Sequence, residues 1–150
     1  MKRSQRLRPI IDLYARQEQD ALLALGRSQR QLQDLQAQLE QLTLYRQEYL
    51  QKLAERQRTG MNVGQLQEFR AFADKLDKAI TGQRQAVSLQ QREVQRASNQ
   101  WEETSHRTKS LEKLAEIAVT EERHQAHKRE QSEQDDFAAR SARKDGIRNA

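Results

Sequence analysis

Apolar residues recur at alternating steps of three and four along residues 7–53, which is the heptad pattern of helices that pack as coiled coils. One register covers the whole stretch, with d positions from Leu7 to Tyr49 and a positions from Ile11 to Leu53. Eleven of these 14 positions are apolar when Tyr and Ala are counted. The pattern therefore predicts one long amphipathic helix with a single apolar seam.

A second seam begins at Leu66, with a positions up to Ala115 and d positions from Phe69 to Ala118. Twelve of its 16 positions are apolar, and the seam is weaker in its middle. This pattern predicts a second amphipathic helix.

The sequence TGMNVG at residues 59–64 separates the two seams, and the first heptad register stops there. Gly60 would occupy the next a position, and glycine ends helices because it adopts left-handed backbone conformations. Asn62 suits the N-cap of a following helix. We therefore predict an all-α fold, a long antiparallel two-helix coiled coil (an αα-hairpin) whose second helix is longer than the first. The alternative is one continuous helix that pairs with a second chain.

The expected organisation is a single hairpin over residues 1–150, with a first helix at about 5–58, a turn at about 59–64, a second helix at about 65–140 and a polar tail at about 141–150. Pro9 falls near the start of the first helix, where its missing N–H is tolerated. A turn centred between residues 61 and 62 places residue i opposite about residue 123 − i, which leaves residues beyond about 120 without an antiparallel partner.

The composition excludes several classes of protein. With 33% charged and 35% hydrophobic residues, the chain has too few apolar side chains to fill a globular core. The absence of cysteine excludes disulfides and thiolate sites, and His106, His124 and His127 do not form a recognisable metal site. A two-helix fold offers no cleft for acid–base catalysis, so neither an enzyme nor a cofactor is expected. No secretory signal and no membrane-spanning run is present, which favours a soluble, cytosolic protein.

The net charge of +5 comes mainly from the N-terminus, where Lys2, Arg3, Arg6 and Arg8 lie without nearby acidic residues. A protein that follows a nucleic-acid backbone needs cations along one whole face. Nucleic acid is therefore not an expected partner.

Two aromatic residues lie beside the seams rather than in them. Tyr45 and Phe72 both occupy g positions, and the pairing rule brings both helices' off-seam rings into one neighbourhood with Leu42, Tyr49 and Leu76. One interpretation is a locally widened seam. The other is an exposed apolar patch that awaits a partner, where aromatic rings are favoured.

These residues resemble the flagellar FliJ family, a coiled-coil component of the bacterial flagellar type III protein export apparatus. The resemblance is carried by Leu39, Leu42, Tyr45 and Tyr49, by Phe69, Phe72, Leu76, Ala79 and Ile80, by a lone Trp101, and by a tail with Asp135, Phe137, Ala138 and Arg140. It implies a monomeric hairpin similar to the central stalk of rotary ATPases, without catalytic activity. It also implies binding to the export ATPase FliI, its regulator FliH, the cytoplasmic region of the export gate FlhA, and export chaperones. The implied location is cytoplasmic, peripheral to the inner face of the cell membrane at the flagellar base.

The resemblance also implies two sets of contact residues. The gate-binding set is Gln38, Leu42, Tyr45, Tyr49, Phe72, Leu76, Ala79 and Gln83, in which Gln83 departs from the basic or imidazole side chain expected there. The ATPase-binding set consists of Lys2, Arg3, Arg6, Arg8, Asp136, Phe137 and Arg140, near the two chain termini. The alternatives are a generic cytosolic structural coiled coil, a related injectisome stalk protein, and a basic protein associated with nucleic acid.

Overall fold

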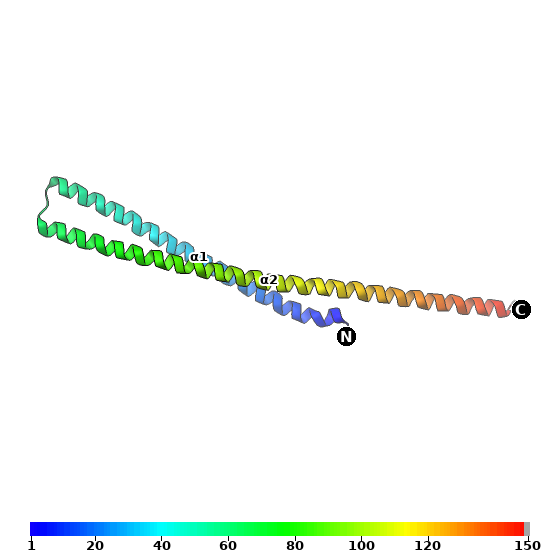
Figure 1. The fold of residues 1–150 in the computed structure, drawn as a ribbon. Coiled ribbons are helices and arrows are strands. Elements are labelled where there is room, and N and C mark those ends of the chain that lie inside the picture. Colours follow the sequence, from blue (N-terminus) through cyan, green and yellow to red (C-terminus); the bar gives the residue numbers. More distant parts are fainter. Residues whose placement is uncertain (149–150) are drawn as a thin grey trace. The chain divides into compact units, whose positions relative to one another are not determined.

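The computed structural model describes residues 1–148, which form two α-helices (Figure 1). Helix α1 spans Arg3–Thr59 and helix α2 spans Val63–Arg148. They form an antiparallel hairpin with the longer helix second, so the predicted all-α fold class is confirmed. Within the described residues, neither helix contains a stretch long and apolar enough to cross a membrane.

The helix bounds differ from the expected ones mainly at the C-terminus. Helix α2 continues to Arg148, eight residues beyond the expected end near 140, although residues 141–148 carry no seam. Helix α1 begins at Arg3, so Pro9 lies inside the helix instead of in its first turn. Because proline has no N–H, the Gln5 carbonyl lacks its usual partner four residues on.

The chain divides into two compact units, which we describe separately. The turn unit is Glu18–Glu103, and the terminal unit combines Met1–Gln17 with Thr104–Ala150. In both units the predicted heptad registers hold. Every a and d position from Leu7 to Leu53 and from Leu66 to Ala118 is buried or half-buried.

Local sequence explains the turn. The Gly60 N–H donates to the Arg56 carbonyl at 3.1 Å, and Gly60 has a φ of 104°, a left-handed value that ends α1 without steric strain. Asn62 is the N-cap of α2, because its Oδ1 accepts the Gln65 N–H at 2.8 Å. Gly60 and Asn62, which the sequence predicts as helix terminator and N-cap, thus satisfy both helix ends at the turn.

The pairing between the helices follows the expected rule to within two turns of helix. In the turn unit, the ion pair Arg46–Asp77 obeys the rule, and Tyr49 contacts Phe72, two residues from its expected partner. Phe72 contacts Tyr45 as well, so the rings of both helices meet in one neighbourhood, as the rule implies.

Candidate functional site

Four of the seven aromatic side chains lie together in the turn unit, and we call them the aromatic cluster: Tyr45, Tyr49, Phe69 and Phe72. The Tyr49 ring contacts both phenylalanines, with its centroid 4.8 Å from Phe72 and 5.2 Å from Phe69. Tyr45 meets Phe72 nearly edge-on, with centroids 6.3 Å apart. Such geometries are the favourable ones for aromatic pairs, so each ring helps to hold the next in place.

The aromatic cluster has a covered side and an open side. Tyr49 and Phe69 occupy d positions and are half-buried, and Leu76 at the next d position of α2 is only 7% exposed. Tyr45 and Phe72 occupy g positions and remain 49% and 37% exposed. Of the two interpretations of the off-seam rings, the structure favours an exposed patch over a widened seam.

The hydroxyl of Tyr49 is anchored within the hairpin. It donates a long hydrogen bond of 3.4 Å to the Phe69 carbonyl on the other helix. Burial raises the pKa of this hydroxyl, and the neighbouring Tyr45 hydroxyl raises it further. Tyr49 therefore keeps its proton at neutral pH and stays available as a donor.

The eight residues predicted to contact the export gate divide according to their heptad positions. The four at g are exposed: Gln38, Tyr45, Phe72 and Ala79. The four at d are buried or half-buried: Leu42, Tyr49, Leu76 and Gln83. The structure thus brings the eight into one stripe of the turn unit, in which the g residues form the accessible surface and the d residues support it.

Gln83 has a structural role that the heptad pattern did not reveal. Its Nε2 donates to the Leu35 carbonyl at 2.9 Å and to the Gln38 Oε1 at 3.1 Å, across the hairpin. One heptad further along α2, Gln90 repeats this arrangement. Its Nε2 donates to the carbonyl and the hydroxyl of Ser28, both at 3.0 Å. The weak middle of the second seam is therefore a pair of cross-helix glutamine contacts.

The seven residues predicted to contact the ATPase all lie in the terminal unit, and all are exposed: Lys2, Arg3, Arg6, Arg8, Asp136, Phe137 and Arg140. From residue 123 to residue 147, α2 is exposed except at the half-buried Ser141. The structure does not bring the N-terminal cations into contact with the three tail residues through any hydrogen bond or ion pair among the described residues.

One contact in the terminal unit was not foreseen from the sequence. Both carboxylate oxygens of Glu122 bind Ser4, one accepting its backbone N–H at 3.1 Å and the other its hydroxyl at 2.7 Å. These bonds lower the pKa of Glu122, and the nearby Lys2 adds to the effect. Both residues lie at a positions one heptad outside the two predicted seams, Ser4 before Ile11 and Glu122 after Ala115.

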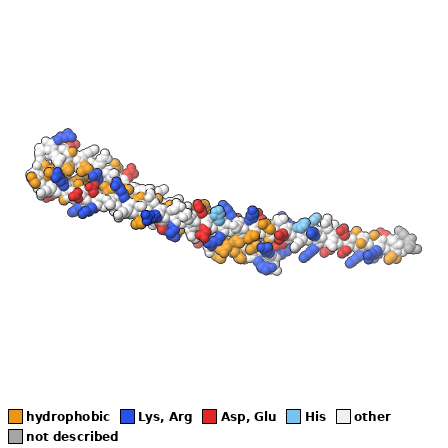
Figure 2. All heavy atoms as spheres, in the orientation of Figure 1, with side chains coloured by type: hydrophobic (Ala, Val, Ile, Leu, Met, Phe, Trp, Pro, Cys, Tyr) orange, Lys and Arg blue, Asp and Glu red, His pale blue; other side chains and the backbone are white. Residues whose placement is uncertain are grey.

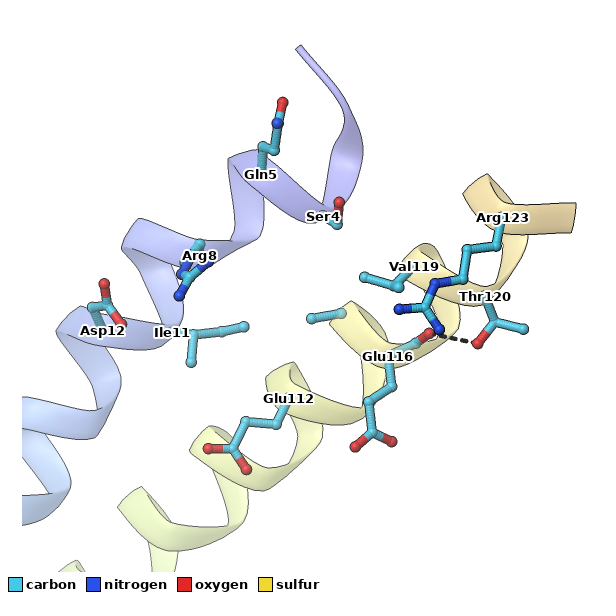
Figure 3. A pocket seen from close by; sticks show the side chains of 11 residues that line it. Ser4, Gln5, Arg8, Ile11, Asp12, Glu112, Glu116, Val119, Thr120 and Arg123 are labelled. Carbon is cyan, nitrogen blue, oxygen red and sulfur yellow. Dashed lines mark hydrogen bonds between the residues drawn. The ribbon is translucent and has the colours of Figure 1, made fainter. Parts of the chain in front are cut away.

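A groove lies between the two helices of the terminal unit, near Ser4 and Glu116 (Figure 3). Ile11 and Val119 point toward each other across its floor, while Arg8, Asp12, Glu112 and Glu116 project from its sides (Figure 3). The groove has three acidic side chains, those of Asp12, Glu112 and Glu116. They do not form a metal site, because no group of three or more His, Cys, Asp or Glu side chains in residues 1–148 is placed to hold a metal ion.

Comparison with known proteins matches nearly the whole chain to one family. Residues 2–146 match the sequence profile of the family described as Flagellar FliJ protein. The chain is also similar to the Flagellar FliJ protein of Escherichia coli (strain K12), with 30% identity over 131 residues that cover 87% of this chain and 89% of that relative. No solved structure matches significantly.

Proposed function

Because this chain belongs to the flagellar FliJ family, we propose that it is a non-enzymatic component of the bacterial flagellar type III protein export apparatus. In this role it couples the export ATPase FliI and its regulator FliH to the export gate FlhA, and it handles export chaperones. It acts in the cytoplasm, held at the inner face of the cell membrane at the flagellar base by its partners.

The exposed rings of Tyr45 and Phe72 support the gate contact. They come from different helices, touch each other, and are held by Tyr49 beneath them. A preorganised aromatic pair loses little conformational entropy on binding, which is why such pairs dominate the energetics of many interfaces. This pair is the single observation that carries the proposed contact with the cytoplasmic region of FlhA.

Replacing both rings by alanine tests the gate contact. In a Tyr45→Ala/Phe72→Ala variant the d residues still fill the seam, so circular dichroism should change little. Binding to the purified cytoplasmic region of FlhA, measured by calorimetry, should weaken by about 2 kcal/mol, or about 30-fold.

The matched control is Leu44→Ala/Leu89→Ala, which removes two exposed leucines of the same unit from outside the stripe. It should leave gate binding unchanged. Equal binding by the ring variant, or loss of its helicity, would show that the two rings serve folding and not the gate.

The seven exposed residues of the terminal unit support the proposed ATPase contact, which combines charge with one apolar ring. Contacts made by Lys2, Arg3 and Arg6 should weaken as salt screens them, whereas a contact made by Phe137 should not. The test compares ATPase binding of Arg3→Ala/Arg6→Ala and Phe137→Ala at two ionic strengths. The arginine variant should lose salt sensitivity, and the phenylalanine variant should lose affinity equally at both. Unaltered binding by both variants would remove the terminal unit from the interface.

A further inference from the structure

Four aliphatic side chains of the terminal unit remain exposed outside its seam: Ile10 and Leu13 on α1, and Leu114 and Ile117 on α2. Each is between 43% and 53% exposed. Ile10 and Leu114 occupy g positions, while Leu13 and Ile117 occupy c positions next to them. We call these four residues the aliphatic patch.

The aliphatic patch is continuous across the two helices. In an antiparallel pair the g positions of both helices lie on the same flank. The contacts Ser4–Glu122 and Tyr14–Arg107 lie on either side of Ile10, which places it opposite the Leu114 region. Figure 2 shows hydrophobic side chains gathered over this part of the molecule. Single exposed leucines are common on proteins, but four that adjoin each other from two helices form a patch of the kind that marks a binding site.

The patch is not needed to hold the helices together. The seam beneath it is already filled by the a and d side chains Leu7, Ile11, Leu111, Ala115 and Ala118, all buried or half-buried. The four patch residues therefore add apolar surface that only a further molecule could cover.

The charges around the patch are mostly of one sign. On the c, f and g positions within one turn of it lie Arg6, Arg16 and Lys113, against a single acidic residue, Glu121. A fourth cation, Arg107, places its guanidinium 5.8 Å from the ring centroid of Tyr14, next to Ile10 and Leu13. The carboxylates of Asp12, Glu112 and Glu116 lie on the opposite flank, where they line the groove of Figure 3.

We propose that the aliphatic patch docks an amphipathic α-helix of a partner protein, one whose apolar stripe is bordered by acidic residues. Two neighbouring helices present a shallow groove that a third helix fits, with aliphatic contacts for affinity and opposite charges at its borders. A second copy of this flank is disfavoured because the basic borders would repel each other. A lipid surface is disfavoured because these side chains are half-covered, whereas a membrane-binding face must enter the bilayer by about 5–10 Å.

The test uses the full chain and a synthetic peptide of about 20 residues, with leucine at a and d, glutamate at e and g, and alanine elsewhere. A twin peptide carries lysine in place of each glutamate. The chain has no cysteine, so Ser110→Cys provides one dye site on the patch flank, and Ser88→Cys provides the matched site in the turn unit. The acidic peptide should bind saturably, change the dye signal at position 110 but not at 88, and bind at least about tenfold more tightly than its twin.

Variants then assign the binding to the patch. Leu13→Gln/Ile117→Gln removes its two outermost residues and should weaken peptide binding at least about tenfold with unchanged helicity. Leu44→Gln/Leu89→Gln removes two leucines of the turn unit with similar or greater exposure and should have no effect. Binding of FlhA should survive Leu13→Gln/Ile117→Gln, which separates this surface from the proposed gate contact.

Four outcomes would overturn the proposal: no saturable binding by the acidic peptide, equal binding of both peptides, equal loss in both variants, or a response at position 88 alone. Binding to vesicles that contain phosphatidylglycerol, lost with Leu13→Gln/Ile117→Gln while the peptide fails to bind, would assign the patch to lipid. A dimer in sedimentation that the same variant dissociates would assign it to a second copy of the chain.

Discussion

At the start of α1, a carboxylate from the other helix binds a backbone N–H that an N-cap side chain would otherwise satisfy. Helix α1 has no acidic residue in its first turn, where a negative charge would favour the helix dipole. Glu122 of α2 supplies that charge instead, and it accepts both the N–H and the hydroxyl of Ser4. A single side chain thus stabilises the helix end and ties it to α2.

This contact should make the N-terminus of α1 sensitive to acid. The bonds to Ser4 favour the charged form of Glu122 and lower its pKa below that of an unfolded glutamate, about 4.3. Their stabilising effect is therefore complete above the unfolded pKa and is lost as the pH falls through the lower, folded pKa. A carboxyl carbon NMR titration should give a lowered midpoint for Glu122, and Ser4→Ala should raise it.

Ser132→Ala, a change on the exposed part of α2, is the control and should leave the midpoint where it was. If Ser4→Ala gave the same midpoint as the unchanged protein, the hydrogen bonds would not be the cause of the lowered pKa.

Residue type alone did not distinguish Tyr45 from Tyr49, but their heptad positions did. The register predicts that Tyr49 at d faces the seam and that Tyr45 at g lies beside it, and their burial agrees. The registers and the pairing rule also place Ser4 and Glu122 at a positions within one turn of each other. Their hydrogen bonds could not be predicted, because these depend on side-chain conformations that a sequence pattern does not specify.

At the scale of the helices, Gln83 and Gln90 are the polar members of an otherwise apolar seam. Each reaches across to a backbone carbonyl at a d position of α1, those of Leu35 and Ser28. Polar side chains in a coiled-coil seam commonly select one register at some cost in stability. Because the two glutamines and the two carbonyls are each one heptad apart, both contacts form at the same offset, and the glutamines are placed to fix that offset between the helices.

Replacing Gln83 and Gln90 by leucine tests whether they fix the offset between the helices. In Gln83→Leu/Gln90→Leu the seam becomes more apolar, and opposite Leu35 it gains a leucine pair, so the free energy of unfolding should rise by roughly 1 kcal/mol. The register should become less uniform. Spin labels on cysteines at Gln29 and Gln91 should report one distance in the unchanged protein and a second, different distance in part of the variant population, because a one-heptad slip moves one helix along the other by about 10 Å.

The control is Gln36→Leu/Gln91→Leu, which changes two exposed glutamines. With spin labels on cysteines at Gln29 and Ser88, this variant should give a single distance between the labels. A single distance in Gln83→Leu/Gln90→Leu as well would mean that the turn, and not the glutamines, determines the offset.

The helices themselves were largely predictable because their signals are local and repeated. Both heptad registers, the break at Gly60 and the N-cap at Asn62 follow from the sequence and appear in the structure. The end of α2 was placed too early because a charged helix without a seam gives no apolar period to follow.

For the molecule as a whole, the main alternative to a monomeric hairpin is a dimer in which two continuous helices exchange seams. The same a and d contacts would form in the hairpin and in the dimer, so burial of the seam does not distinguish the two. The conformation of the turn distinguishes them. Gly60 has a backbone conformation that a continuous helix cannot contain, and Asn62 caps a new helix. Intramolecular pairing also brings the two seams together at a far higher effective concentration than two separate chains would have.

We therefore expect a monomer at micromolar concentration, with a mass of 17.6 kDa in sedimentation equilibrium. Twice that mass in the unchanged protein would contradict the hairpin. The informative comparison is Gly60→Ala/Asn62→Ala, which removes the cap and puts a Cβ on a residue with a φ of 104°. That strain costs roughly 1 kcal/mol, and the lost cap costs about as much again, whereas a continuous helix through residues 60–62 gains from alanine's propensity. The variant should accordingly shift toward the exchanged dimer as its concentration rises, because only the turn chemistry distinguishes the two states.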